Sequence, residues 1–122
     1  MPRPVHFEIP ADDPERAGKF YEDVFGWQIS KWDGPEDYWL IKSGDKEQPG
    51  IDGGIARKND MLSSVTNTID VPDVDQFTDK IKSKGGTVLM PKMAVPEVGW
   101  MAYCKDTEGN IFGLMQMDPT AK

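Results

Sequence analysis

The sequence has little of the chemistry that several large classes of protein require. Its 122 residues contain one cysteine, Cys104, and one histidine, His6. A single cysteine excludes an internal disulfide and a cysteine-rich zinc site, and a single histidine excludes any site that needs two histidines from one chain. The 14 lysines and arginines are outnumbered by 21 acidic residues, which gives a formal charge of −7. Nucleic acids and anionic membrane surfaces are therefore not expected partners.

Long hydrophobic runs are also missing. The longest apolar stretches, such as Ile111 to Met115, are far shorter than the roughly 20 residues that cross a bilayer. The N-terminus has no basic segment followed by a long apolar one, so a signal peptide is not expected. These features predict a soluble, cytoplasmic protein without a membrane-spanning segment.

The first half of the chain predicts a strand followed by an amphipathic helix. Val5 to Ile9 alternates between apolar and polar residues, as a half-buried strand does. Asp13 and Pro14 are typical of a helix start, and Gly26 is typical of a helix end. Between these signals an apolar stripe recurs at helical spacing, which predicts that this face of the helix packs in the core. The stripe consists of Ala17, Phe20, Tyr21, Val24 and Phe25.

Strand-like runs complete the first half, and the second half repeats the same order at an offset of 60 residues, with Asp73 in the place of Asp13. The expected strands of the first half are Trp27 to Lys31, Tyr38 to Ser43 and Ile51 to Ala56. Those of the second half are Val65 to Val71, Thr87 to Met90, Trp100 to Cys104 and Ile111 to Gln116. The pattern predicts an α+β fold of two βαβββ modules, residues 1–60 and 61–122.

Two other features of the second half have simple interpretations. The segment Pro91 to Gly99 contains two prolines and is expected to form a loop that covers a cleft or a partner subunit. Cys104 has no base near it in the sequence and is expected to pack in the core.

Four motifs occur in a fixed order along the chain. They are Val5-His6-Phe7-Glu8, Asp13-x-Glu15-Arg16-Ala17-x-x-Phe20-Tyr21, Phe25-Gly26-Trp27 and Gly99-Trp100-Met101-Ala102-x-x-x-Asp106-x-Glu108-Gly109-Asn110. In this combination the sequence resembles the vicinal oxygen chelate superfamily, which includes glyoxalase I (lactoylglutathione lyase), bleomycin-resistance proteins and extradiol dioxygenases. The resemblance implies that the modules form a curved, open mixed sheet around a cleft, with the helices outside, often in a homodimer.

The resemblance also implies where metal ligands would lie. In the metal-dependent members the ligands come from the first and last strands of each module. The corresponding positions here are His6, Gly53, Thr66 and Gly113. Glycine has no side-chain donor and threonine is a poor ligand, so only His6 of this set binds a metal well. No complete catalytic metal site and no cofactor are therefore expected; the alternative is a divalent metal at a displaced site, where Glu8 joins His6 with Asp52 or Asp70.

The expected ligand-binding residues surround His6 and Glu8, which share one face of the first strand. Imidazole exchanges protons near neutral pH, so His6 is the sharpest candidate. Trp39 and Trp100 are included because aromatic side chains form the walls of apolar ligand sites, although either can instead pack in the core. The full expected set is His6, Glu8, Trp39, Gly53, Thr66, Trp100 and Gly113. No catalytic residue is assigned.

The sequence thus predicts a protein that binds a small organic molecule in its cleft and forms a homodimer. Two alternatives stay open. One is a metal-dependent lyase or isomerase related to lactoylglutathione lyase, or a dioxygenase-like enzyme. The other is a non-enzymatic protein that sequesters a drug or metabolite, as bleomycin-resistance proteins do.

Overall fold

The computed structural model describes residues 2–122, which divide into two compact units. The N-terminal unit is His6–Thr66, and the C-terminal unit is Asn67–Lys122 together with the first residues up to Val5. The elements follow the order βαβββ twice along the chain, which confirms the predicted α+β class and its two modules. In the described part of the chain, no helix is long and apolar enough to span a membrane.

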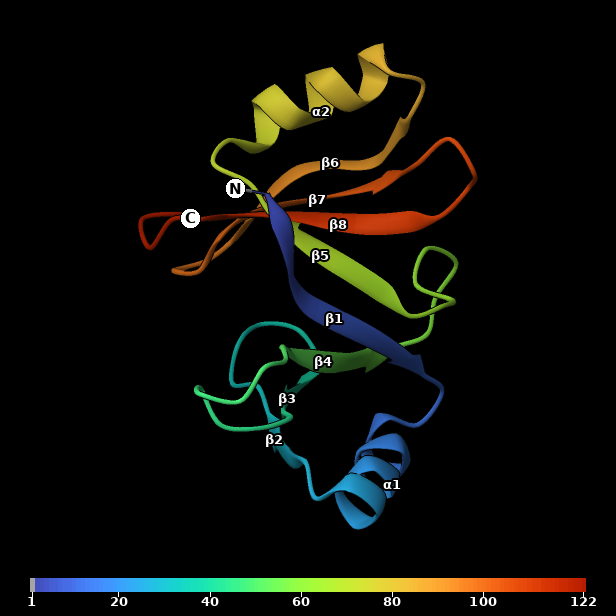
Figure 1. Cartoon of the computed structure of the whole chain (residues 1–122), viewed down its shortest axis with the longest axis vertical. Helices are drawn as coiled ribbons and strands as arrows, with labels where there is room; N and C mark the ends of the chain where they lie inside the picture. The colour runs from blue at the N-terminus through green and yellow to red at the C-terminus, as the bar shows by residue number, and fades with distance from the viewer. Residues whose placement is uncertain (1) are drawn as a thin grey trace. The chain divides into compact units, whose positions relative to one another are not determined.

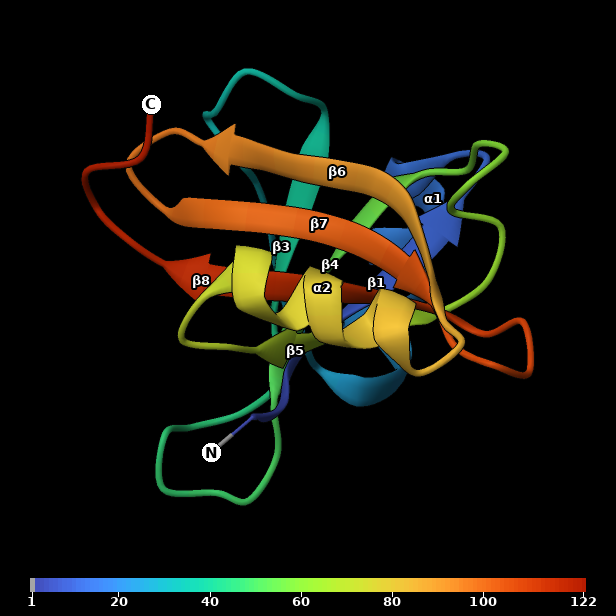
Figure 2. The same ribbon diagram turned by 90° about the horizontal axis from the view of Figure 1, so that it is seen from above.

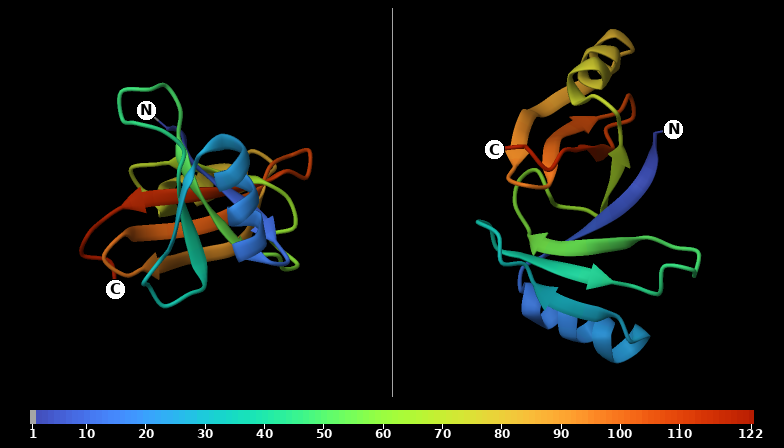
Figure 3. Two further views of the ribbon diagram at one scale, coloured as in Figure 1. Left: turned by 90° about the horizontal axis from the view of Figure 1, so that it is seen from below. Right: turned by 90° about the vertical axis from the view of Figure 1, so that its left-hand side faces the viewer.

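The N-terminal unit combines one helix with a four-stranded sheet. The elements are β1 (Arg3–Ala11, which belongs to this unit from His6 onward), α1 (Pro14–Phe25), β2 (Gln28–Lys31), β3 (Tyr38–Lys42) and β4 (Asp52–Arg57). The strand order is β2-β3-β4-β1, with β4 parallel to β1 and the other neighbours antiparallel. Figure 3 (right) shows β2, β3 and β4 side by side with α1 next to them.

The C-terminal unit repeats this arrangement. Its elements are β5 (Thr66–Asp70), α2 (Val74–Ser83), β6 (Thr87–Val95), β7 (Gly99–Lys105) and β8 (Ile111–Met117). The strand order is β5-β8-β7-β6, and β5 is parallel to β8. Figure 1 shows α2 beside β6, and in Figure 2 the helix lies against the strands of its own unit.

Both helices begin where local sequence signals place them. The Asp13 side chain accepts a hydrogen bond from the Arg16 N–H at 3.1 Å, and the Asp73 side chain accepts one from the Gln76 N–H at 3.2 Å. Gly26 ends α1 with a φ of 75°, a left-handed conformation that glycine adopts without a steric penalty. The predicted helix starts and the end of α1 are confirmed.

The segment expected to form a covering loop is mostly strand. β6 continues through Pro91 to Val95, and its pairing with β7 shifts register between Val88 and Met90 and again between Met90 and Met93. Proline has no N–H to donate and is tolerated on an edge strand at such irregularities. The prediction of a loop from Pro91 to Gly99 is therefore wrong, because the irregular pairing lets the edge strand pass its proline.

Three of the five residues in the apolar stripe predicted for α1 lie outside the core. Gly18 is buried against β2. A β-carbon added to Gly18 would lie 3.0 Å from Ile29 Cγ2. In contrast, Phe20, Val24 and Phe25 are 57%, 55% and 61% exposed. The helix packs through its small residues, which allow a close approach to the sheet. The prediction that the whole stripe is buried is wrong.

Each unit has its own core between helix and sheet. The buried residues of the N-terminal core are Ala11, Trp39, Ile41 and Ile55. Those of the C-terminal core are Val71, Val74, Ala102, Cys104 and Leu114. Cys104 is fully buried, as predicted, and this burial raises the pKa of its thiol.

Replacing Gly53 with alanine is expected to destabilise the fold by about 2–3 kcal/mol, since overpacking of this kind is costly. A β-carbon at Gly53 would overlap both the carbonyl oxygen and the ring of Phe7. Gly113→Ala is the control, because its β-carbon would come no closer than 3.2 Å, to Thr68 Oγ1. Urea denaturation measures both variants, and an equal loss of stability would contradict this account of the packing.

Candidate functional site

The N-terminal unit brings His6 and Tyr38 into direct contact. His6 Nε2 lies 2.7 Å from Tyr38 Oη, and the two rings are nearly parallel with centroids 6.3 Å apart. Trp32 packs edge-on against Tyr38, with ring centroids 6.2 Å apart. Tyr38 therefore contacts both an aromatic ring and the imidazole.

This contact depends on Gly54, which lies on β4 between β1 and β3. A β-carbon at Gly54 would overlap the Tyr38 hydroxyl, so the phenol crosses the strand at the place where a side chain is missing. Glu8 is in register with Gly54, and His6 shares its face of β1 because side chains alternate along a strand. The intervening Phe7 packs in the core on the α1 side. His6, Glu8 and Tyr38 thus lie together on the face of the sheet opposite α1.

Burial and nearby carboxylates set the protonation of His6 in opposite directions. Burial lowers the pKa of His6 below its usual value, and the negative charges of Glu8 and Asp52 raise it in part. Asp52 is in register with His6, and its Oδ1 accepts a hydrogen bond from the Ser43 N–H at 2.9 Å. The net lowering favours a neutral imidazole at pH 7, with one nitrogen that donates and one that accepts.

The structure places Trp39 and Gly53 away from this face. Trp39 is 7% exposed in the core, and its ring is flanked by Lys31 Nζ at 5.3 Å and Arg57 Cζ at 5.6 Å. Gly53 is in register with Phe7, on the side that faces α1. The structure therefore does not bring these two predicted residues together with His6 and Glu8.

The reason is a one-residue difference between the modules. Gly113 is in register with Thr68, whereas in the N-terminal unit it is Gly54 that is in register with Glu8. The register of β4 against β1 therefore differs by one residue from the 60-residue offset that relates it to β8. A shift of one residue along a strand places every side chain on the opposite face of the sheet. Sequence reasoning missed Gly54 for this reason, although the pair Gly53-Gly54 was a visible signal.

The remaining predicted residues lie on or beside β5, β7 and β8. Thr66 is 1% exposed, and it is Thr68, two residues further along β5, that is in register with Gly113. Trp100 instead packs against the C-terminal core, where its Nε1–H donates to Asp118 Oδ2 at 3.0 Å. Lys92 Nζ lies 4.8 Å from the Trp100 ring centroid. Ligand contact by these residues stays a prediction.

The donors present do not fit the metal of the superfamily's metal-dependent members. By strand register, the position that the resemblance implies for a metal ligand is occupied by Gly54 and not by Gly53. Glycine at this position also lacks a side-chain donor. Within residues 2–122, no three His, Cys, Asp or Glu side chains are grouped so that they could hold a metal ion. Glu8 and Asp52 act on His6 through their charge, but a Ser43 N–H already holds the Asp52 carboxylate.

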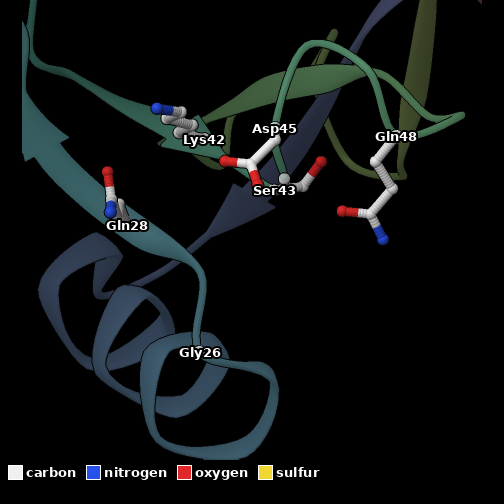
Figure 4. A pocket seen from close by; sticks show the side chains of 7 residues that line it. Gly26, Gln28, Lys42, Ser43, Asp45 and Gln48 are labelled. Carbon is white, nitrogen blue, oxygen red and sulfur yellow. The ribbon is translucent and has the colours of Figure 1, made fainter.

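Two hollows lie apart from the His6–Tyr38 pair. The one in the N-terminal unit has a volume of about 160 Å³ and is polar, and Figure 4 shows its side chains; it is lined by Gly26, Gln28, Lys42, Ser43, Gly44, Asp45 and Gln48. The one in the C-terminal unit has a volume of about 360 Å³ and is lined by Pro2, Asp70, Val71, Pro72, Phe77, Gln116 and Met117. The first is smaller than the roughly 300–1,000 Å³ typical of ligand sites. In the second, the Val74 N–H already donates to Gln116 Oε1 at 3.0 Å.

Comparisons with known proteins are consistent with this architecture. Residues 3–42 match the family "Bleomycin resistance protein-like N-terminal". A glyoxylase-like domain-containing protein of Didymella fabae is 34% identical over 113 residues, covering 84% of each chain. A Mycobacterium bovis protein with glyoxylase in its name, CFP32, is 28% identical over 117 residues, which are 93% of this chain but only 45% of that protein.

Solved structures of low sequence identity share the fold. Protein BH1468 of Bacillus halodurans C-125 matches with a TM-score of 0.75 at 9% identity, over 100% of this chain and 99% of that one. A Streptomyces coelicolor methylmalonyl-CoA epimerase matches with a TM-score of 0.72 at 17% identity, over 98% of this chain and 97% of that one.

The single histidine permits a direct test of the site's electrostatics. In an NMR titration, His6 is expected to titrate below its ordinary pKa, because burial disfavours the imidazolium ion. Glu8→Gln and Asp52→Asn are each expected to lower that pKa further, since each removes a charge that raises it. Asp60→Asn, in the exposed segment between the modules, is the control and should leave the titration unchanged. A rise in the His6 pKa on removing either carboxylate would refute this description.

Proposed function

Because this chain belongs to the vicinal oxygen chelate superfamily, among its glyoxylase-like members, we propose that it binds a small organic molecule on the face that carries His6, Glu8 and Tyr38. The observation that supports this most is the 2.7 Å contact between His6 Nε2 and Tyr38 Oη. The pair presents a neutral imidazole and a phenol side by side, which together can donate to and accept from a carbonyl or hydroxyl group.

The surroundings of the pair suit an organic ligand with a flat or apolar part. Trp32 and Tyr38 meet at a right angle, and Leu40, which shares the strand face of Tyr38, is 40% exposed. Aromatic and aliphatic side chains supply the area of a ligand site, while a few polar groups orient the ligand. Binding of an organic ligand to the face of His6, Glu8 and Tyr38 needs no metal. The proposal therefore does not include a complete catalytic metal site.

A second candidate function is proton transfer, as in a lyase or isomerase. It is favoured by the position of Glu8, a carboxylate only 8% exposed that lies two residues from His6 on the same face. Imidazole and carboxylate groups are common general bases, and this face carries one of each. A third candidate, sequestration of a cationic drug or metabolite, is favoured by the net charge of −7.

The homodimer and the cytoplasmic location expected from the sequence are part of the proposal.

Binding is tested by the quenching of tryptophan fluorescence, for which Trp32 provides a reporter beside Tyr38. The probes are bleomycin and the hemithioacetal of methylglyoxal and glutathione. Saturable quenching is expected, and both His6→Ala and Tyr38→Phe should weaken it at least tenfold, about 1.4 kcal/mol, since each removes a polar anchor. Val65→Ala is the control, because Val65 is 64% exposed and outside this face. Saturable quenching that both site variants leave unchanged would place the ligand elsewhere.

The same probes separate binding from catalysis. If the hemithioacetal is consumed and Glu8→Gln abolishes its consumption, the protein is a proton-transfer enzyme. If the probe is bound but recovered unchanged, it is a binding protein.

Metal binding is tested by isothermal titration with nickel and zinc. No binding tighter than about 10 μM is expected, and His6→Ala should not alter the titration, because the superfamily's ligand positions offer one good donor. About one ion per chain that is lost on His6→Ala would show that a metal site exists and contradict this part of the proposal.

A further inference from the structure

Methionines gather on one face of the C-terminal sheet, where β6, β7 and β8 lie side by side (Figure 2). Met101 on β7 is in register with Met93 on β6 and with Met115 on β8, so these three side chains form one row across neighbouring strands. Met117 lies on the same face because it is two residues beyond Met115. Met90 does so because its partner on β7 is two residues beyond Met101. This methionine face consists of Met90, Met93, Met101, Met115 and Met117, which are five of the seven methionines in the chain.

The methionine face is opposite α2 and is separate from the core. The other side of the same strands packs in the core with aliphatic residues, where one row consists of Ile69, Leu114 and Ala102. Among the described residues, neither core cluster includes a methionine. The five methionines are instead half-buried or exposed, with Met93 at 37% and Met117 at 66%. Core packing, the usual use of methionine, therefore does not account for this group of thioethers.

Thioether sulfur is a soft donor that selects one class of metal ion. Methionine favours Cu(I), whereas carboxylates and water suit harder ions such as Mg²⁺ and Ca²⁺. Residues in register on antiparallel strands have Cα atoms about 4.5–5.5 Å apart. Because methionine has three rotatable bonds, the sulfurs of Met93 and Met115 can both turn toward an ion beside Met101. Asp70 on β5 is in register with Met115 and places a carboxylate in the same row, which offsets the charge of a cation.

We propose that Met93, Met101 and Met115 form a binding site for a soft monovalent metal ion, Cu(I). The net charge of −7 favours a cation as the occupant. The site lies within the C-terminal unit and uses neither His6 nor Tyr38, so it goes beyond the organic ligand proposed above and does not depend on it. It also differs from the nickel and zinc binding tested there, because its donors are thioethers.

The experiment is NMR spectroscopy of the full chain with isotope-labelled methionine methyl groups, titrated with silver nitrate in a chloride-free buffer. Ag(I) is the probe because it shares the charge and softness of Cu(I) and is stable in air. Saturation at about one ion per chain is expected, with shifts in the methyl signals of Met93, Met101 and Met115. Cu(I) added without oxygen should shift the same three signals. Met61, in the segment between the modules, is the internal control and should keep its signal.

Leucine variants separate a metal site from an apolar surface. Met101→Leu conserves the volume and apolar character of the side chain but removes its sulfur, so it should raise the dissociation constant for Ag(I) at least tenfold. Met93→Leu should do the same, and it perturbs the fold least because Met93 is 37% exposed on the edge strand β6. Met61→Leu is the matched control and should bind Ag(I) normally. Circular dichroism checks that each variant is folded.

Two further variants exclude the other soft donors of the chain. His6→Ala and Cys104→Ala remove the imidazole and the thiol, and both should leave the shifts in the row unchanged. The proposal is overturned if neither ion shifts the three methionine signals, or if either leucine variant binds Ag(I) as tightly as the unsubstituted protein. Loss of these shifts on His6→Ala or Cys104→Ala would also overturn it.

Discussion

The chemistry of the N-terminal unit depends on the missing side chain at Gly54. Because β4 presents only backbone there, the Tyr38 phenol crosses the strand and reaches His6 Nε2 at 2.7 Å. Any other residue at this position would force Tyr38 aside and leave His6 without this contact. A close approach of this kind is one of the few uses of glycine in a strand interior, where it otherwise weakens the sheet. One glycine therefore connects the register of β1 and β4 with the properties of the candidate site.

Burial then determines which chemistry the face offers. His6 is partly covered, so the charged imidazolium is disfavoured, while the carboxylates of Glu8 and Asp52 oppose that effect. The Ser43 N–H donates to the Asp52 carboxylate at the start of β4 and holds it in place. This balance suits the binding of a polar organic group or the transfer of a proton. It does not suit a metal, because the positions that would complete a coordination sphere are glycine or threonine.

Local signals in the sequence predicted the order of the elements. The sheet face on which each side chain lies depends on pairing between distant strands, which local signals do not reveal. Asp13, Asp73 and Gly26 define helix ends through hydrogen bonds and backbone conformation within a few residues, so these predictions were confirmed. The faces of Trp39 and Trp100, the choice of Gly54 over Gly53 and the contact between His6 and Tyr38 all depend on strand register, which no local pattern contains.

Periodicity in α1 showed a similar limit. The apolar stripe correctly indicated a helix, but it did not reveal that the sheet would contact the small-residue side and leave Phe20, Val24 and Phe25 exposed. The period of an apolar stripe therefore identifies a helix, but the packing of the sheet decides which side of that helix is buried.

The most direct measurement of the central claim is a crystal structure of the protein with a bound organic ligand. The account predicts that a polar atom of the ligand lies within hydrogen-bond distance of His6 Nε2 or Tyr38 Oη, with its apolar part toward Trp32 or Leu40. A ligand held only in the hollow beside Phe77, or only in the polar hollow at Lys42, with the His6–Tyr38 contact undisturbed, would contradict it.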